Sequence, residues 1–215
     1  MKISYAIPVC NEHIELEKLL EFLTKHIDDE DEIIVQCDKG NTTPEVYRVL
    51  SIFEVSVLAP VGFPDPLKVI EFPLNGHFAD FKNNLKEHCT GDWIFQIDAD
   101  ELPHEGLITN LKYILKNNPT VEMFLVPRVN TVEGLTQEHI NKWRWRVNKD
   151  GWVNWPDYQP RIIQNSPKIK WQNKVHEQIV GISTKSVLPT EEPFCLYHPK
   201  TIGKQEVQNQ FYESL

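Results

Sequence analysis

The sequence predicts an α/β fold, in which a mostly parallel, Rossmann-like sheet with helices on both faces is followed by a small antiparallel C-terminal lobe. Through residues 1–126, short apolar runs alternate with segments whose apolar residues recur at helical spacing, and this order is typical of parallel strands joined by helical crossovers. After residue 130 the pattern changes to short alternating strands, and five of the six Trp residues lie between positions 143 and 171. This change predicts the antiparallel lobe.

The composition narrows the classes of function. A net charge of −9 and a sequence pI of about 5.4 argue against electrostatic binding of nucleic acid. No apolar run approaches the roughly 20 residues that cross a bilayer, and the N-terminus has no signal-peptide pattern, so no integral membrane segment is expected. The four Cys residues lack the spacing of a zinc site or a disulfide framework, so we expect reduced thiols and a cytoplasmic protein.

The first half of the chain supplies the predicted parallel sheet. Ile3–Val9 is the first strand, and we expect Asn11 to cap the helix that follows. That helix buries one stripe, formed by Leu16, Leu19, Leu20, Leu23 and Ile27. Glu32–Cys37 is the second strand, and Thr43-Pro44 is typical of a helix start, so a second helix is expected to run to about Phe53.

Further elements follow in the same order. Strands are expected at Val55–Leu58 and Lys68–Phe72, with a proline-rich loop between them. A helix over Phe78–Cys89 leads into the short apolar strand Trp93–Ile97. The remaining predicted elements are helices over 107–115 and 203–215 and strands over 121–126, 161–163 and 174–180.

Three carboxylates follow the Trp93–Ile97 strand directly, in the order Asp98-Ala99-Asp100-Glu101. Because side chains two residues apart in an extended chain point the same way, we expect Asp98 and Asp100 to present their carboxylates together. Neighbouring negative charges repel unless a cation lies between them, and hard oxygen ligands favour Mg²⁺ or Mn²⁺ over Zn²⁺. Open α/β sheets bind ligands at the carboxyl ends of their strands, so the pattern indicates a site for a metal ion and a diphosphate, although solvated turns can carry the same short motif.

Three more polar segments stand in a definite order before this motif. Pro8-Val9-Cys10-Asn11-Glu12 ends the first strand, Asp38 and Gly40 follow the second, and residues 76–83 open the helix before the carboxylates. This ordered set resembles the GT-A glycosyltransferases, and specifically the large inverting family 2. The resemblance covers residues 1 to about 110 closely and continues more loosely through residues 157–161, Trp171, 174–177 and 196–198. Cys10, Asn41, Thr43 and Lys82 depart from the residues that are usual in that family.

The resemblance implies a donor site and a metal site. The nucleotide-sugar would bind at Pro8, Asn11, Glu12, Asp38, Lys82, Asn83, Asp98 and Ala99. The metal, Mn²⁺ or Mg²⁺, would be bound by Asp98, Asp100 and His198, with Asp100 as the direct ligand, Asp98 reaching the ribose or a metal-bound water, and His176 as the alternative to His198. Simpler interpretations exist for four of these residues. Glu12 can be an ordinary first-turn acid, Asp38 a turn-forming residue, and Lys82 and Asn83 part of a polar helix face.

An inverting transfer also needs a base that removes the proton of the acceptor hydroxyl. The GT-A pattern implies a carboxylate C-terminal to the metal motif, and Glu177 is the first candidate, followed by Asp157 and then Glu101. Without that role Glu177 is a surface acid on a half-buried strand. Most of the Trp residues between 143 and 171 are expected to form the core of the C-terminal lobe and not to stack on sugars. Trp152 and Trp155 are better candidates for contact with the acceptor than Trp143 or Trp171.

Residues 1–215 are therefore expected to form a single GT-A-like domain, with nucleotide-sugar and metal binding in 1–110, the acceptor side in 111–202 and a C-terminal helix in 203–215. The expected function is metal-dependent transfer of a sugar, of the hexosyltransferase type, from a nucleotide-sugar to a hydroxyl with inversion. A UDP-sugar is the first expectation for the donor, and the acceptor is a glycan, a lipid-linked sugar or a protein. The alternatives are a non-catalytic module that binds nucleotide-sugars, and a sugar-phosphate nucleotidyltransferase, although the first strand is not followed by the Gly-rich phosphate loop typical of the latter.

Overall fold

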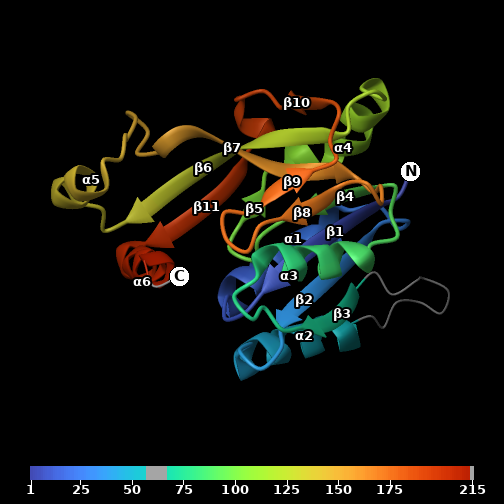
Figure 1. The fold of residues 1–215 in the computed structure, drawn as a ribbon, viewed down its shortest axis with the longest axis horizontal. Helices are drawn as coiled ribbons and strands as arrows, with labels where there is room; N and C mark the ends of the chain where they lie inside the picture. Colours follow the sequence, from blue (N-terminus) through green and yellow to red (C-terminus); the bar gives the residue numbers. More distant parts are fainter. Residues whose placement is uncertain (57–66, 214–215) are drawn as a thin grey trace.

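The computed structural model describes residues 1–56 and 67–213 and contains one large mixed sheet (Figure 1). Its strand order is β3-β2-β1-β4-β7-β6-β11-β5, with β10 beside β6. The four strands at one end are mutually parallel: β1 (Ile3–Val9), β2 (Glu32–Asp38), β3 (Leu67–Phe72) and β4 (Trp93–Gln96). Parallel pairing here follows from the helical crossovers that the sequence predicts.

The other half of the sheet is of mixed direction. β7 (Val153–Gln164) pairs antiparallel with both β4 and β6 (Met123–Glu133). β11 (Leu196–Thr201) pairs parallel with β6 and antiparallel with β5 (Leu102–Pro103), and β10 (Lys185–Val187) pairs parallel with β6. A separate two-stranded antiparallel sheet joins β8 (Lys170–Gln172) to β9 (Gln178–Val180). The α/β class, with a mostly parallel sheet and a small antiparallel addition, is therefore confirmed.

Helices cover both faces of the sheet, as predicted. The odd-numbered residues of β1 pack with α1 (His13–His26), α2 (Pro44–Ser56) and α4 (Glu105–Asn117) in one core. On the opposite face, Ala6 and Ile34 pack with Leu85 of α3 (Phe78–Glu87) and with Ile169. In Figure 1, α3 lies in front of β1 and β2 beside β8 and β9.

Several predicted bounds are wrong for local reasons. Glu12, not Asn11, is the N-cap of α1. Of the strand predicted over Val55–Leu58, residues 55 and 56 belong to α2 and residues 57 and 58 lie outside the described part, as does the proline-rich loop. The strand predicted over 174–180 is confirmed only for β9, because residues 173–177 form the β8–β9 turn, with Asn173 at φ 82°.

The C-terminal part of the described chain contains three further helices and five Trp residues. They are α5 (Gln137–Trp143), the 3₁₀ helix η1 (Glu192–Phe194) and α6 (Ile202–Glu213). Trp171 is buried as predicted for a core residue, whereas Trp143 and Trp145 stand half-buried with ring centroids 4.7 Å apart, and Trp152 and Trp155 likewise at 4.8 Å. Within the described residues, no helix has the length and apolarity needed to span a membrane.

Candidate active site

The loops after β1 and β2 are tied together at one edge of the sheet. The Thr43 backbone N–H donates to the carbonyl of Cys10 at 3.0 Å. The buried Asp38 carboxylate accepts from the backbone N–H of Leu74 at 2.9 Å and from the Asn41 amide at 3.0 Å, so it fastens the loops after β2 and β3. The Glu12 carboxylate accepts from two backbone N–H groups of its own loop, at 2.9 and 3.0 Å. Both acids shape the edge where a nucleotide is expected, and their contact with it stays a prediction.

The remaining donor-site candidates take varied positions around this edge. Pro8 is half-buried in β1, Asn11 is exposed after it, and Ala99 is buried in the turn after β4. The Asn83 side chain is used structurally, because it exchanges two hydrogen bonds with the Trp171 backbone at 2.9 and 2.8 Å. That exchange holds β8 against α3, and the role of Asn83 in nucleotide binding stays a prediction.

Asp98 and Asp100 turn to different partners, contrary to the expectation that their carboxylates point together. The chain turns here, since the Glu101 N–H donates to the Asp98 carbonyl at 2.8 Å, and the two-residue alternation of a strand does not apply. The Asp98 carboxylate pairs with Arg161, while Asp100 Oδ2 lies 3.1 Å from His198 Nε2. Asp98 therefore belongs to a buried ion network, and Asp100 faces the predicted histidine.

The buried network contains two arginines that the sequence did not single out. Arg161, from β7, is 3% exposed and places Nη2 2.6 Å from Glu101 Oε1, in addition to its contact with Asp98. Arg128, from β6, binds the same Glu101 oxygen at 2.9 Å and Asp157 Oδ2 at 2.7 Å. Burial by itself would raise the pKa of Asp98, but the positive charges of Arg161, Lys82 and Arg128 together outweigh it and hold this pKa below its usual range. The lowered pKa keeps the Asp98 carboxylate ionised and paired with Arg161.

A hydrogen-bonded chain sets the orientation of His198. Asn130 donates its amide N–H to Asp157 Oδ2 at 2.9 Å, which leaves Asn130 Oδ1 to accept from His198 Nδ1 at 2.7 Å. With its proton on Nδ1, a neutral imidazole directs the Nε2 lone pair at an Asp100 oxygen. Two acceptors that face each other call for a cation or a proton between them. Burial would raise the pKa of Asp100, but His198 and then Lys200 lower it well below its ordinary value.

This geometry fits a divalent cation at two protein ligands. Carboxylate oxygen and imidazole nitrogen are both suitable donors for Mn²⁺, and Mg²⁺ is commonly held by one or two carboxylates together with substrate phosphates. Across residues 1–56 and 67–213, no group of three His, Cys, Asp or Glu side chains is gathered as a metal site. The predicted third ligand, Asp98, is occupied by Arg161, so a metal at Asp100 and His198 would draw its other ligands from the substrate or water.

Glu177, the first candidate for the base, lies in the turn between β8 and β9. It pairs with Lys82 of α3, whose ammonium also lies 4.5 Å from the centroid of the Trp171 ring. Both side chains are partly accessible. Asp157, the second candidate, accepts hydrogen bonds from Arg128, Asn130 and Gln159, and its pKa is lowered because Arg128 and these bonds outweigh burial. Glu101, the third, is fully buried between the two arginines.

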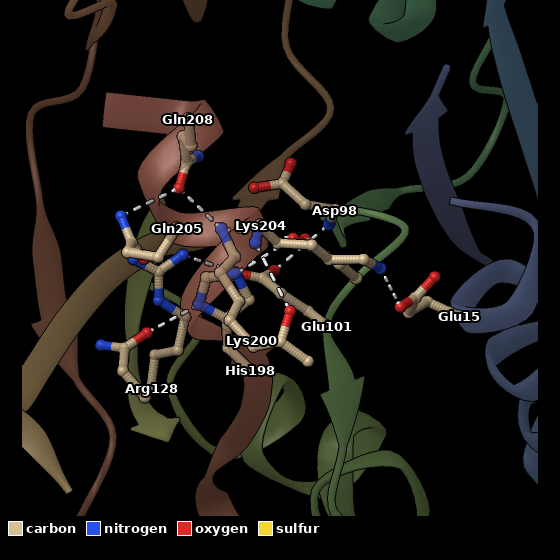
Figure 2. A network of polar contacts seen from close by, with 12 residues as sticks. Glu15, Asp98, Glu101, Arg128, His198, Lys200, Lys204, Gln205 and Gln208 are labelled. Atoms are coloured by element: carbon tan, nitrogen blue, oxygen red, sulfur yellow. Dashed lines mark hydrogen bonds and ion pairs between the residues drawn. The ribbon is translucent and has the colours of Figure 1, made fainter. Parts of the chain in front are cut away.

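A cavity of about 560 Å³ opens beside Asp100. Its lining includes Glu15 of α1, Ala99 and Asp100 of the turn, Gly151, and Lys200 and Lys204 of the β11–α6 segment. Figure 2 shows His198, Lys200 and Lys204 converging on this region from β11 and α6, with Glu15 reaching Lys204 from α1. The C-terminal segment, which the sequence predicted only as a polar helix, thus forms one wall of the site.

Comparisons with known proteins agree with this architecture. The family model described as "Glycosyl transferase family 2" matches residues 4–180. An "Uncharacterized glycosyltransferase" from Haemophilus influenzae is 30% identical over 87 residues, which are 40% of this chain and 29% of that protein. The crystal structure of residues 1–349 of S. aureus TarS aligns with a TM-score of 0.59 and 14% identity, over 93% of this chain and 60% of that fragment. The structure of the same fragment in complex with UDP-GlcNAc aligns with a TM-score of 0.60 and 14% identity, over 93% of this chain and 59% of the fragment.

The chain therefore spans less than a third of the curated relative and about three fifths of the TarS fragment. At 14% identity the structural likeness establishes a shared fold, and it confirms the predicted GT-A architecture. The family assignment rests on the family model, whose match extends from β1 to β9 and takes in the Asp98–Glu101 turn, Arg161 and Glu177. The chain belongs to glycosyl transferase family 2.

Proposed function

We propose that this protein is a metal-dependent glycosyltransferase that moves a sugar from a nucleotide-sugar to a hydroxyl group with inversion. The observation that carries the proposal is the Asp100–His198 pair, in which Asn130 holds the imidazole with Nε2 3.1 Å from a carboxylate oxygen. Such an arrangement supports a divalent cation at the carboxyl edge of the sheet, beside a cavity large enough for a sugar phosphate.

Asp100 and His198 would hold the Mn²⁺ or Mg²⁺, which would offset the negative charge that develops on the departing nucleoside diphosphate. Asn130 and Asp157 fix the imidazole, as outer partners of metal ligands commonly do. Arg161 and Glu101 hold the turn that presents Asp100. Asn130, Asp157, Arg161 and Glu101 therefore act by positioning the two metal ligands.

Glu177 is the favoured base for the acceptor hydroxyl. Glu101 is fully buried between two arginines, and Asp157 accepts hydrogen bonds from three side chains. Among the contacts that the structure describes, Glu177 pairs with Lys82 alone, and its carboxylate is partly accessible. In the transfer, the acceptor oxygen bonds to the anomeric carbon while the bond to the diphosphate oxygen breaks, and Glu177 takes the hydroxyl proton. A single displacement of this kind inverts the anomeric configuration.

The donor is proposed to be a UDP-sugar. The S. aureus TarS fragment, which shares the fold, has been solved with UDP and with UDP-GlcNAc, so UDP-GlcNAc is the first donor to test. A glycan, a lipid-linked sugar or a protein would supply the acceptor hydroxyl, and a cytoplasmic site of action and hexosyl transfer complete the proposal.

Release of the nucleoside diphosphate (UDP or GDP) from UDP-GlcNAc and from a panel of UDP- and GDP-hexoses, with Mn²⁺ and candidate acceptors, tests the proposal. We expect turnover by the wild type, inverted product by NMR of the anomeric proton, and a loss of roughly 10²–10⁴-fold in Glu177→Gln with UDP affinity retained. Glu122→Gln, which alters a surface acid paired with Lys168, is the matched control and should leave turnover unchanged. Nucleotide binding without turnover of any donor would instead support the non-catalytic module.

A further inference from the structure

Lys200 occupies an unusual position for a lysine. Its side chain is 9% exposed, and its ammonium lies 3.4 Å from Asp100 Oδ2, the same oxygen that His198 Nε2 approaches at 3.1 Å. Lys200 and His198 lie two residues apart in β11, so their side chains leave the strand on the same side. A buried ammonium is costly to desolvate, and here a single carboxylate oxygen, shared with His198, is its anionic partner among the contacts that the structure describes.

The helix that follows holds this ammonium in place. Gln208 of α6 accepts from Lys200 Nζ at 2.9 Å, and Gln205 donates to Asn209 at 2.9 Å on the same helix face. One turn earlier, Lys204 pairs with Glu15 across the cavity. Figure 2 shows Lys200, Gln205 and Gln208 gathered above His198. The first turns of α6 therefore fix Lys200 on the cavity wall, where it lines the same space as Asp100.

We propose that Lys200 binds the diphosphate of the nucleotide-sugar and carries part of the charge that develops when the sugar departs. This inference rests on the proposed function and adds a cationic residue to its donor site. An ammonium is a compact point charge that suits phosphate oxygens, and Asp100 and Gln208 keep it directed at the cavity before the donor arrives. When the bond between the anomeric carbon and the diphosphate oxygen breaks, that oxygen keeps the electron pair, and Lys200 donates a hydrogen bond to the diphosphate without losing its proton.

The same position makes Lys200 a competitor for Asp100. A divalent cation bound at Asp100 and His198 draws on the oxygen that Lys200 now contacts, and like charges a few ångströms apart repel. Once phosphates are bound, their negative charge can accommodate both cations. Removal of the Lys200 charge should thus strengthen metal binding by the nucleotide-free protein and weaken binding of the diphosphate, and a lysine that only neutralises Asp100 would not produce the second effect.

The test is calorimetric titration of UDP and of UMP into the wild type, Lys200→Met, Lys200→Arg and Lys112→Met, each with EDTA and with Mn²⁺. Lys112 is the matched control, because it is a partly buried lysine paired with carboxylates in another part of the molecule. We expect Lys200→Met to weaken UDP binding about 10- to 100-fold and UMP binding several-fold less, with partial recovery in Lys200→Arg and no change in Lys112→Met. Manganese titration followed by electron paramagnetic resonance should show tighter Mn²⁺ binding by nucleotide-free Lys200→Met.

Circular dichroism establishes that each variant is folded, and if Lys200→Met is not, Gln208→Ala replaces it, with an expected loss in UDP affinity of about 2- to 5-fold. Wild-type affinity for UDP in Lys200→Met would overturn the inference and leave the proposed function standing. Equal losses for UDP and UMP would overturn it as well, since a diphosphate contact must favour UDP. A wild-type protein that binds no UDP in any condition would overturn both.

Discussion

Replacing Arg161 by Met removes the guanidinium that lies between Asp98 and Glu101. Loss of one partner from a buried ion pair typically costs ~3–5 kcal/mol, because the remaining charge is left without compensation. Glu101 keeps Arg128 at 2.9 Å and the Asp98 N–H at 3.2 Å, and the Asp98 side chain, at 33% exposure, can regain water. The expected loss in the free energy of unfolding is therefore at the lower end, ~3 kcal/mol.

Urea unfolding at neutral pH, followed by circular dichroism, measures this loss. With a slope of roughly 2–3 kcal/mol per molar urea for a chain of this size, the midpoint should fall by about 1–1.5 M. Lys168→Met is the matched control, since Lys168 pairs with Glu122 at the surface and is 51% exposed, and it should cost less than about 1 kcal/mol. If Arg161→Met lowers the midpoint no more than Lys168→Met does, the buried network does not hold the turn that carries Asp100.

Three further experiments test separate parts of the structure. Asn130→Ala removes the acceptor that fixes the His198 ring, so Mn²⁺ affinity should fall about 10- to 100-fold in a paramagnetic-resonance titration, and unchanged affinity would contradict the orienting role. Gly181 and Gly151 both have a positive φ, 82° and 80°, but a Cβ at Gly181 would overlap the Lys168 carbonyl, whereas nothing lies within 4 Å of a Cβ at Gly151. Gly181→Ala should therefore lower the free energy of unfolding by roughly 2 kcal/mol more than Gly151→Ala, as measured by thermal unfolding. Equal losses would refute the predicted overlap. Burial raises the pKa of Glu32, but bonds from Lys2, Ser4 and Thr90 outweigh it and lower this pKa to about 2. Because the folded pKa lies below the unfolded value of about 4.3, ionised Glu32 stabilises the protein above that pH, and this stabilisation is lost as the pH falls toward 2. Glu32→Gln should flatten the pH dependence of the free energy of unfolding in urea and cost ~1–2 kcal/mol at pH 7, after allowance for the partial solvation of Glu32. A pH profile unchanged by the substitution would contradict this role of Glu32.

Elements set by local pattern could be predicted from the sequence. β1, β2 and the start of α2 at Pro44 agree with their predicted positions, because β-branched runs and a helix-starting proline act over a few residues. The geometry of Asp98 and Asp100 could not be predicted in the same way. Their expected alternation depends on an extended chain, and a turn stabilised by Arg161, more than 60 residues away, replaces it.

The parts of the site that the sequence missed depend on strand register. β7 runs between β4 and β6, which brings Arg161 beneath Asp98, and the pairing of β11 with β6 places His198 opposite Asn130. A charged residue beside the apolar pair Ile162-Ile163 was the available signal for Arg161, since a buried charge requires a partner. Lys200 offered no comparable signal, because its burial depends on α6 folding back over β11.

We propose that Asp100 and His198 form a metal-dependent site for a nucleoside diphosphate. Calorimetric titration of UDP with and without Mn²⁺, on the wild type and on Asp100→Ala, tests it most directly. We expect Mn²⁺ to strengthen UDP binding by the wild type at least ~10-fold and to have no such effect on Asp100→Ala. Preferential binding of GDP would change the proposed donor alone, whereas UDP and GDP affinities that do not respond to Mn²⁺, or a response that persists in Asp100→Ala, would contradict the claim.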